Sequence, residues 1–156
     1  MFERMIMTNT GGGKSPKQNT GPVALASDGG VDWYGEVNVE DFINGIDLAN
    51  LVNLTDGTAF NSNEPWLHVG LDGKELYIPK KSFRRSLHYN HLLALNLVHG
   101  NRIVNIQGKD YKIRLFKSIK DGVSPTLFNE TQDPIQTADS EYNRIIYRLI
   151  TTPTFI

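Results

Sequence analysis

The four histidines are the residues whose type and spacing could bind a metal ion. His88 and His91 lie three positions apart, which places both imidazoles on one face of a helix, and His68 and His99 could approach them in space. A zinc site needs at least a third ligand and supporting hydrogen bonds, and no recognised spacing marks either. Histidines on a polar helix face explain the pair equally well. We therefore expect no metal site.

A second motif that could do chemistry is the run Gly-Lys-Ser at residues 13–15, but its context does not fit a phosphate-binding loop. The motif needs an earlier glycine where Thr8 stands, and a helix where Pro16 follows. The sequence also contains no nucleophile elbow, metalloprotease helix or paired-carboxylate motif. Ser140 and Glu141 are typical of a helix cap rather than an acid/base pair. We predict that the chain is not an enzyme and has no catalytic residue and no cofactor.

Basic residues after residue 79 could form a contact surface. Lys80, Lys81, Arg84 and Arg85 are the basic cluster of the sequence. Phosphate contact would need aromatic or polar groups beside the charge, and Phe83 alone gives thin support. A solvated loop edge explains the cluster more simply, so we expect no nucleic-acid partner.

Aromatic residues offer a second contact surface. Trp33, Tyr34 and Trp66 could stack on sugars, aided by a long loop over 118–137, although aromatic residues in a small β-rich domain more often belong to the core. The possible interaction surface is therefore formed by Trp33, Tyr34, Lys80, Lys81, Arg84 and Arg85.

Charge and composition exclude several classes of protein. The formal net charge of −1 gives no global field that would recruit nucleic acid or an anionic membrane. The absence of cysteine excludes disulfides, thiolate zinc sites and thiol catalysis. No apolar run approaches the length of a signal peptide or a membrane helix, so we expect no membrane partner.

Two hairpins are predicted to build the sheet that positions these residues. Residues 66–81 turn at Asp72-Gly73, which supplies the positive φ values of a tight turn, and then alternate with the period of a half-buried strand. Residues 102–116 turn at 108–110, and the return strand shows the clearest alternation in the sequence.

Apolar spacing predicts two or three helices. The first is expected over 46–52, after a break at Asn44-Gly45. The second is expected over 88–98, largely buried, with Gly100 as its C-cap. A third, near the end of the sequence, is expected to bury the stripe Tyr142, Ile145, Ile146 and Leu149.

Residues 1–30 are predicted to form a flexible or extended N-terminal arm. Thr8 to Gly30 is dominated by Gly, Asn, Thr, Ser, Lys and Pro, and has too little apolar surface to offset its ordering entropy. Such arms often gain order on a partner subunit. Residues 31–156 are predicted to form a single α+β domain, with a small antiparallel sheet of two hairpins and two or three packed helices.

Six stretches, taken together and in order, resemble a known family. They are WYGEV at 33–37, LTDGT at 54–58, NEPWL at 63–67, GKELYIPKK at 73–81 with Arg84 after it, IQGKDYKIRL at 106–115 and SEYNR at 140–144. The set resembles a group of tailed-bacteriophage virion structural proteins described as tail, fibre or appendage proteins. Longer members continue into a lectin-like or sulfatase-modifying-like half, and this chain resembles their N-terminal part. Tyr142 stands where tryptophan is expected.

The resemblance implies a structural function. It indicates a bacteriophage virion protein of the tail, neck or fibre apparatus, located in the virion after assembly in the host cytoplasm. Its expected partners are other virion proteins and further copies of itself. Two alternatives stay open: a capsid decoration protein, and a receptor- or glycan-binding module that contacts a host surface glycan. No catalytic residue comes with the resemblance.

Overall fold

The computed structural model describes residues 5–9, 25–28, 30–116, 140–141 and 143–147. The strands in this part of the chain are β1 (Met5–Asn9), β2 (Ala26–Asp28), β3 (Val31–Val37), β4 (Thr58–Ala59), β5 (Trp66–Leu71), β6 (Lys74–Pro79), β7 (Arg84–Arg85), β8 (His99–Ile106) and β9 (Lys109–Leu115). The helical elements described there are the 3-10 helix η1 (Val39–Asp41), α1 (Gly45–Leu51), α2 (Tyr89–Ala94) and the π-helical segment Asn143–Tyr147. The predicted α+β class is confirmed.

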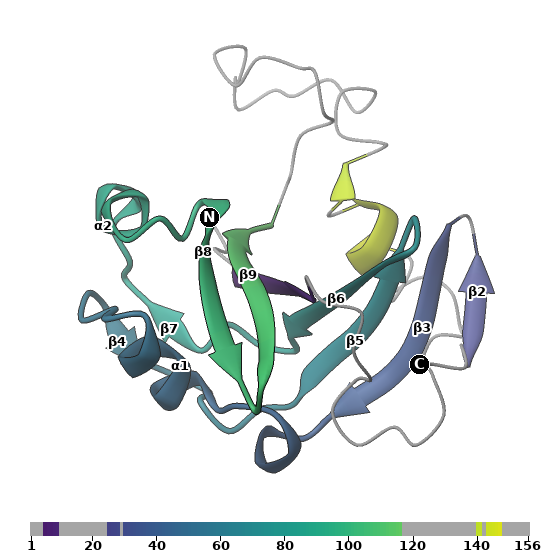
Figure 1. Cartoon of the computed structure of the whole chain (residues 1–156), viewed down its shortest axis with the longest axis horizontal. Helices are drawn as coiled ribbons and strands as arrows, with labels where there is room; N and C mark the ends of the chain where they lie inside the picture. The colour runs from purple at the N-terminus through teal and green to yellow at the C-terminus, as the bar shows by residue number, and fades with distance from the viewer. Residues whose placement is uncertain (1–4, 10–24, 29, 117–139, 142, 148–156) are drawn as a thin grey trace.

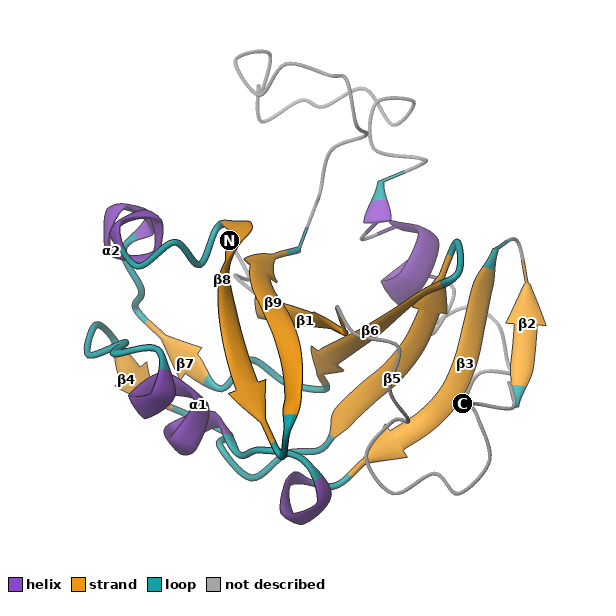
Figure 2. Cartoon of the chain, viewed as in Figure 1, coloured by secondary structure: helices purple, strands orange, loops and turns teal. Residues whose placement is uncertain are grey.

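Seven strands form one antiparallel sheet in the order β2-β3-β5-β6-β1-β9-β8, and β4 pairs with β7 in a separate sheet of two strands. The strands are drawn in orange in Figure 2. The two predicted hairpins are present as β5–β6 and β8–β9. Two hairpins do not describe the whole sheet, however, because three further strands extend and join them.

Both hairpins close through two-residue turns with positive φ. Asp72 and Gly73 have φ values of 49° and 79°, and Gln107 and Gly108 have values of 52° and 82°. Positive φ at both positions matches the twist that antiparallel strands need. The first turn is the predicted one. The second begins one residue earlier than predicted, since Ile106 already pairs with Lys109.

The N-terminal arm predicted over residues 1–30 is not confirmed. Met5–Asn9 forms β1, which lies between β6 and β9 and joins the two hairpins into one sheet. Ile6 and Met7 are fully buried, on opposite faces of the strand. A central strand is covered on both faces, so its apolar residues are consecutive and do not alternate, which hides it from a search for period two. Ala26–Asp28 also pairs in the sheet, as β2, and residues 10–24 lie outside the described residues.

Each face of the sheet has its own hydrophobic core. On one face, Met7, Trp66 and Tyr77 pack with residues of α1 and α2. On the other face, residues of β5 and β6 pack against Ile145 and Ile146 of the π-helical segment, shown in yellow in Figure 1. The predicted C-terminal stripe is therefore confirmed for these two isoleucines. Its other members, Tyr142 and Leu149, lie outside the described residues.

The first predicted helix is confirmed together with its break. The Asn44 side chain accepts a hydrogen bond from the Asp47 backbone N–H at 2.8 Å and caps α1. The second helix is shorter than predicted, because α2 spans only Tyr89–Ala94. It is also more exposed: Leu92 is fully buried, but Leu93 is 42% exposed.

Both α-helices end in the same motif, with asparagine in the place of glycine. In α2, the Asn96 N–H bonds to the Leu93 carbonyl at 3.0 Å, and the Leu97 N–H bonds to the Leu92 carbonyl at 2.9 Å. Asn96 has a φ of 60°, which asparagine tolerates better than most residues. Gly100, the predicted C-cap, instead lies in β8.

The small sheet brings two distant loops together beside α1 and α2, at the left of Figure 1. β4 and β7 pair through Thr58 with Arg85 and Ala59 with Arg84. This pairing sets the turn at residues 55–57 next to the start of α2. We call this part of the molecule, formed by α1, β4, β7 and α2, the side lobe.

Candidate functional site

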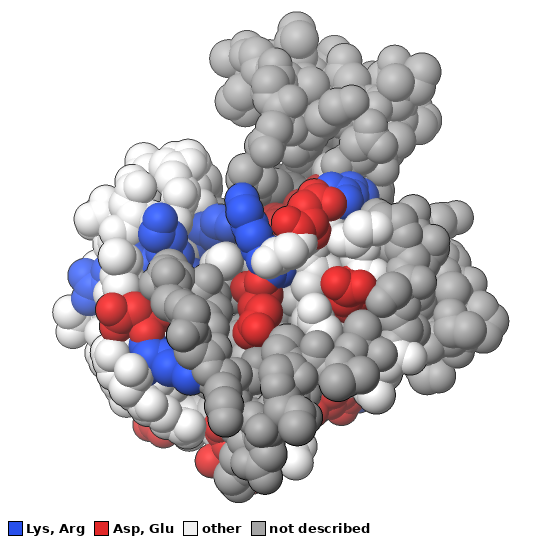
Figure 3. Space-filling model, turned by 45° about the vertical axis from the view of Figure 1, so that its right-hand side comes forward, with Lys and Arg blue, Asp and Glu red and all other residues white. Residues whose placement is uncertain are grey.

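The four basic residues of the predicted interaction surface have partners within the fold. The Nζ of Lys80 lies 2.6 Å from the Glu36 carboxylate, and the Nζ of Lys81 lies 2.7 Å from that of Glu64. Arg85 stacks over a ring, with its guanidinium carbon 5.3 Å from the ring centroid of Phe60. On the face shown in Figure 3, positive and negative side chains are intermixed. These contacts fit the solvated, ion-paired interpretation of the cluster.

Arg84, the fourth basic residue, is turned toward the backbone. Its Nε donates to the Asp56 carbonyl at 2.9 Å, and its Nη2 donates to the carbonyls of Gly57 and Thr55 at 3.3 and 3.5 Å. One guanidinium thus holds three consecutive carbonyl groups. Arg84 therefore positions the 55–57 turn.

The two aromatic residues of the predicted surface belong to β3 and are partly buried. Trp33 packs against the core that contains Ile145. The Tyr34 ring lies 4.7 Å from that of His68, above Gly70, where a Cβ would lie 2.9 Å from the tyrosine Oη. Burial and the nearby carboxylates raise the pKa of Tyr34. The predicted aromatic residues thus lie in β3, Arg84 and Arg85 lie in the side lobe, and Lys80 and Lys81 follow β6, with Lys80 paired to Glu36 of β3. The loop over 118–137 lies outside the described residues.

The first cluster of titratable groups surrounds His68 and is buried. The His68 side chain is 1% exposed, and its ring stacks on Tyr77 with a centroid distance of 4.5 Å and an interplanar angle of 7°. Its Nε2 lies 3.4 Å from the Glu75 carboxylate. Burial, aided by the charge of Glu75, raises the pKa of Tyr111 to about 12. The His68 ring is closed to solvent, although Glu75 is 21% exposed, so we assign His68 to the core.

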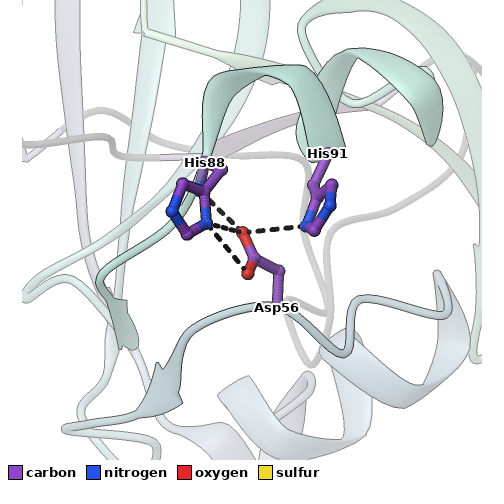
Figure 4. Close-up of side chains that lie close together, drawn as sticks. All are labelled: Asp56, His88 and His91. Atoms are coloured by element: carbon purple, nitrogen blue, oxygen red, sulfur yellow. Dashed lines mark hydrogen bonds and ion pairs between the residues drawn. The ribbon is translucent and has the colours of Figure 1, made fainter.

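The second cluster is open to solvent and consists of Asp56, His88 and His91 (Figure 4). The Nδ1 of His88 lies 3.1 Å from each Asp56 carboxylate oxygen, and the Nδ1 of His91 lies 3.2 Å from Oδ2. The Asp56 side chain is 13% exposed, whereas the side chains of His88 and His91 are 75% and 64% exposed. Three potential metal ligands therefore converge at the surface of the side lobe.

The backbone around Asp56 fixes the position of its carboxylate. Oδ2 accepts a hydrogen bond from the His88 backbone N–H at 2.7 Å, and this bond is the main reason that the pKa of Asp56 is lowered to about 2. The neighbouring Gly57 has a φ of +72°, and a Cβ there would lie 2.5 Å from the Arg85 carbonyl oxygen. The turn thus needs glycine at 57 for both conformation and space.

The structure supplies the third ligand that the sequence lacked. Asp56 comes from a turn 32 residues before His88, and an Asp-Gly pair is an ordinary turn signal, so nothing in the sequence marks it as a ligand. His68 belongs to the buried cluster, and His99 lies in β8. In the part of the chain that the structure describes, the ligand atoms of Asp56, His88 and His91 all lie within 4.8 Å of one another.

Comparison with known proteins finds no protein-family model, curated protein or solved structure that matches the chain. Among the described residues, no helix has the length and apolar character that crossing a membrane requires.

Proposed function

We propose that the chain is a structural protein of a tailed-bacteriophage virion, part of the tail, neck or fibre apparatus. It assembles in the host cytoplasm through contacts with other virion proteins and with copies of itself. The resemblance of the six ordered stretches supports this proposal. The prediction that the chain is not an enzyme stays a prediction.

The observation that carries the proposal is the use of the motif residues inside the fold. The indole Nε1 of Trp66 donates to the Ile43 carbonyl at 2.6 Å, and Tyr77 and Tyr111 are almost fully buried. Arg84 binds three backbone carbonyls, as described above. Residues that stabilise the fold in this way are what a structural protein requires.

Two further motif residues tie the C-terminal segment to the sheet. Glu141 is buried and forms a two-pronged ion pair with Arg114 of β9. Arg144 contacts both carboxylate oxygens of Asp72, in the β5–β6 turn, at 2.7 Å. Paired, planar contacts of this kind fix orientation as well as distance. The SEYNR stretch therefore has a fold-stabilising role in its described residues.

The side lobe supplies a surface for assembly contacts. Four of the seven large hydrophobic residues that are exposed in the described part of the chain belong to it, namely Ile46, Leu51, Tyr89 and Leu93, and a fifth, Phe60, directly follows β4. Tyr89 and Leu93 lie four positions apart in α2 and share one face of the helix. Exposed apolar residues that gather in one region favour a protein–protein contact.

Immunogold electron microscopy tests the proposal. An antibody against the full chain should label the tail, collar or fibres of purified particles of the phage that encodes it. Label spread over the head would favour the alternative of a capsid decoration protein. Protein found only in infected cells, with no label on particles, would overturn the virion proposal and leave the glycan-binding alternative, for which Trp33→Ala should abolish binding to a glycan array without unfolding the protein.

A further inference from the structure

We propose that Asp56, His88 and His91 bind one divalent transition-metal ion of the zinc class, which clips α2 to the 55–57 turn. The inference rests on the geometry of the cluster and does not depend on the virion proposal.

The distances between the ligand atoms fit one ion. Zinc binds histidine nitrogen and carboxylate oxygen at about 2.0–2.1 Å, so two ligands at a tetrahedral angle lie about 3.3–3.4 Å apart. The observed separations from Asp56 Oδ2 are 3.1 Å to the His88 Nδ1 and 3.2 Å to the His91 Nδ1. The remaining separation, between the ligand atoms of the two histidines, is within 4.8 Å, so binding one ion requires rotation of these exposed side chains toward each other.

Hydrogen bonding already aims the required atoms. Each imidazole turns its Nδ1 toward the Asp56 carboxylate (Figure 4). When the ion binds, each Nδ1 lone pair goes to the metal, and the proton of a neutral imidazole is carried by Nε2, on the other side of the ring. The metal ion thus takes the place of the Nδ1 protons between the imidazoles and the carboxylate, and the backbone does not have to move.

A second set of contacts supports the ligands. The His88 backbone N–H donates a hydrogen bond to Asp56 Oδ2. The Arg84 guanidinium donates to the backbone carbonyls of Thr55, Asp56 and Gly57. Such outer contacts orient ligands and typically contribute 10–100-fold to metal affinity. Asp56 is consequently fixed before an ion arrives.

The chemistry of the ligands selects the kind of ion. Two imidazoles with one carboxylate suit zinc, nickel, cobalt or copper, whereas calcium and magnesium prefer oxygen ligands. The chain has no cysteine that could offer a competing thiolate site. Because both histidines are mostly exposed, an ion can enter from solvent and keep water in its remaining position.

Isothermal titration calorimetry with Zn²⁺ on the tag-free, chelator-treated full chain tests the proposal. The expected result is one ion per chain, with affinity lowered at least about tenfold in His91→Ala and in Asp56→Asn. Asp56→Asn keeps an oxygen acceptor for the His88 N–H, so it tests the negative charge and not the turn. His99→Ala, which removes a different exposed histidine, should bind as the wild type does.

Two further readouts separate a built site from nonspecific binding. Co²⁺ should give visible absorption bands in the wild type and in His99→Ala, but not in His91→Ala. Zn²⁺ at about 100 times its dissociation constant should raise the Tm by about 5–11 °C. Wild type that binds no Zn²⁺, His91→Ala that binds as tightly as wild type, or equal losses in His91→Ala and His99→Ala would each overturn the proposal.

Discussion

In the described part of the chain, histidine meets a carboxylate at two places, which differ in burial. His68 is 1% exposed, lies between the rings of Tyr34 and Tyr77, and contacts Glu75. His88 and His91 are 75% and 64% exposed and converge on Asp56. The first cluster fills the space between strands and cannot exchange its partners for a solute. The second can do so, because the side chains of both its histidines are mostly exposed.

The difference shows that residue type alone does not identify a site. Both clusters pair imidazole with carboxylate, but His68 and Glu75 stand on the paired strands β5 and β6, whereas Asp56 lies in a turn and the two histidines lie at the start of α2 and within it. Solvent exposure decides whether each cluster can bind a solute, and this exposure depends on how the rest of the chain packs around the cluster. Substitutions that alter one cluster at a time, each with a matched change at the other cluster or elsewhere, separate the two roles.

The largest expected effect comes from truncating the buried histidine. His68→Ala removes a ring that stacks on Tyr77 and leaves a cavity beside Glu75, so the free energy of unfolding should fall by about 2–4 kcal/mol. His91→Ala, at the exposed cluster, should change it by less than about 0.5 kcal/mol in a chelator. Urea denaturation of both variants measures the difference. Equal losses would contradict the assignment of His68 to the core.

Gly57→Ala should have the next largest effect. It combines a positive φ with a Cβ that would lie 2.5 Å from the Arg85 carbonyl oxygen, and should cost about 2–3 kcal/mol. Gly73→Ala is the control: its φ is +79°, but nothing lies within 4 Å of the added Cβ, so only the backbone cost of about 1–2 kcal/mol should appear. Thermal unfolding compares the two variants. A Gly73→Ala variant that is the less stable of the two would show that steric contact at the 55–57 turn is unimportant.

Arg84→Met should have a moderate effect on the free energy of unfolding and a larger effect on the Zn²⁺ affinity of the cluster formed by Asp56, His88 and His91. Three backbone carbonyls lose their donor, which should cost about 1–2 kcal/mol and loosen Asp56. Zn²⁺ affinity should then fall about 10–100-fold, although no ligand has changed. Arg85→Met removes a neighbouring charge that contacts only the face of Phe60 among the contacts described, and should leave both quantities nearly unchanged. Calorimetric titration measures both affinities. Equal Zn²⁺ affinities of the two arginine variants would contradict the positioning role of Arg84.

The smallest expected effect concerns the Tyr111 phenol, and it changes the stability only at alkaline pH. The pKa of Tyr111 is raised to about 12, mainly by burial, whereas an unfolded tyrosine titrates near 10. The folded state therefore binds this proton more tightly, and the stability that it contributes is complete below about pH 10 and lost as the pH rises toward 12. Tyr111→Phe should flatten the dependence of Tm on pH over this range, and Tyr89→Phe, at an exposed position, should not. Indistinguishable alkaline profiles for the two variants would contradict the role given to burial.

Local signals predicted the parts of the fold that local chemistry controls. Asp72-Gly73 predicted its hairpin turn, because positive φ at two consecutive positions is a property of the turn itself. Asn44-Gly45 predicted the break before α1 through its weak helix propensity, and in the structure the Asn44 side chain caps the helix. The same kind of reasoning failed for Met5–Asn9, whose place in the centre of the sheet depends on partners more than 60 residues away.

For the same reason, the sequence indicated only two of the three residues of the candidate site. The three-residue spacing of His88 and His91 is a local property of a helix and could be read directly. Asp56 reaches them only through the pairing of β4 with β7 and through the contacts of Arg84, and both are tertiary interactions. Two members of the basic cluster that the sequence assigned to a solvated loop edge, Arg84 and Arg85, have a positioning role and a ring contact in the fold.

A crystal structure of the full chain grown with Zn²⁺, with anomalous diffraction recorded on both sides of the zinc absorption edge, tests the central claim most directly. We expect one anomalous peak at about 2.0–2.1 Å from the Asp56 carboxylate and from the Nδ1 atoms of His88 and His91, and none beside His68. A peak at His68, or no peak at the exposed cluster in zinc-containing crystals, would contradict that claim.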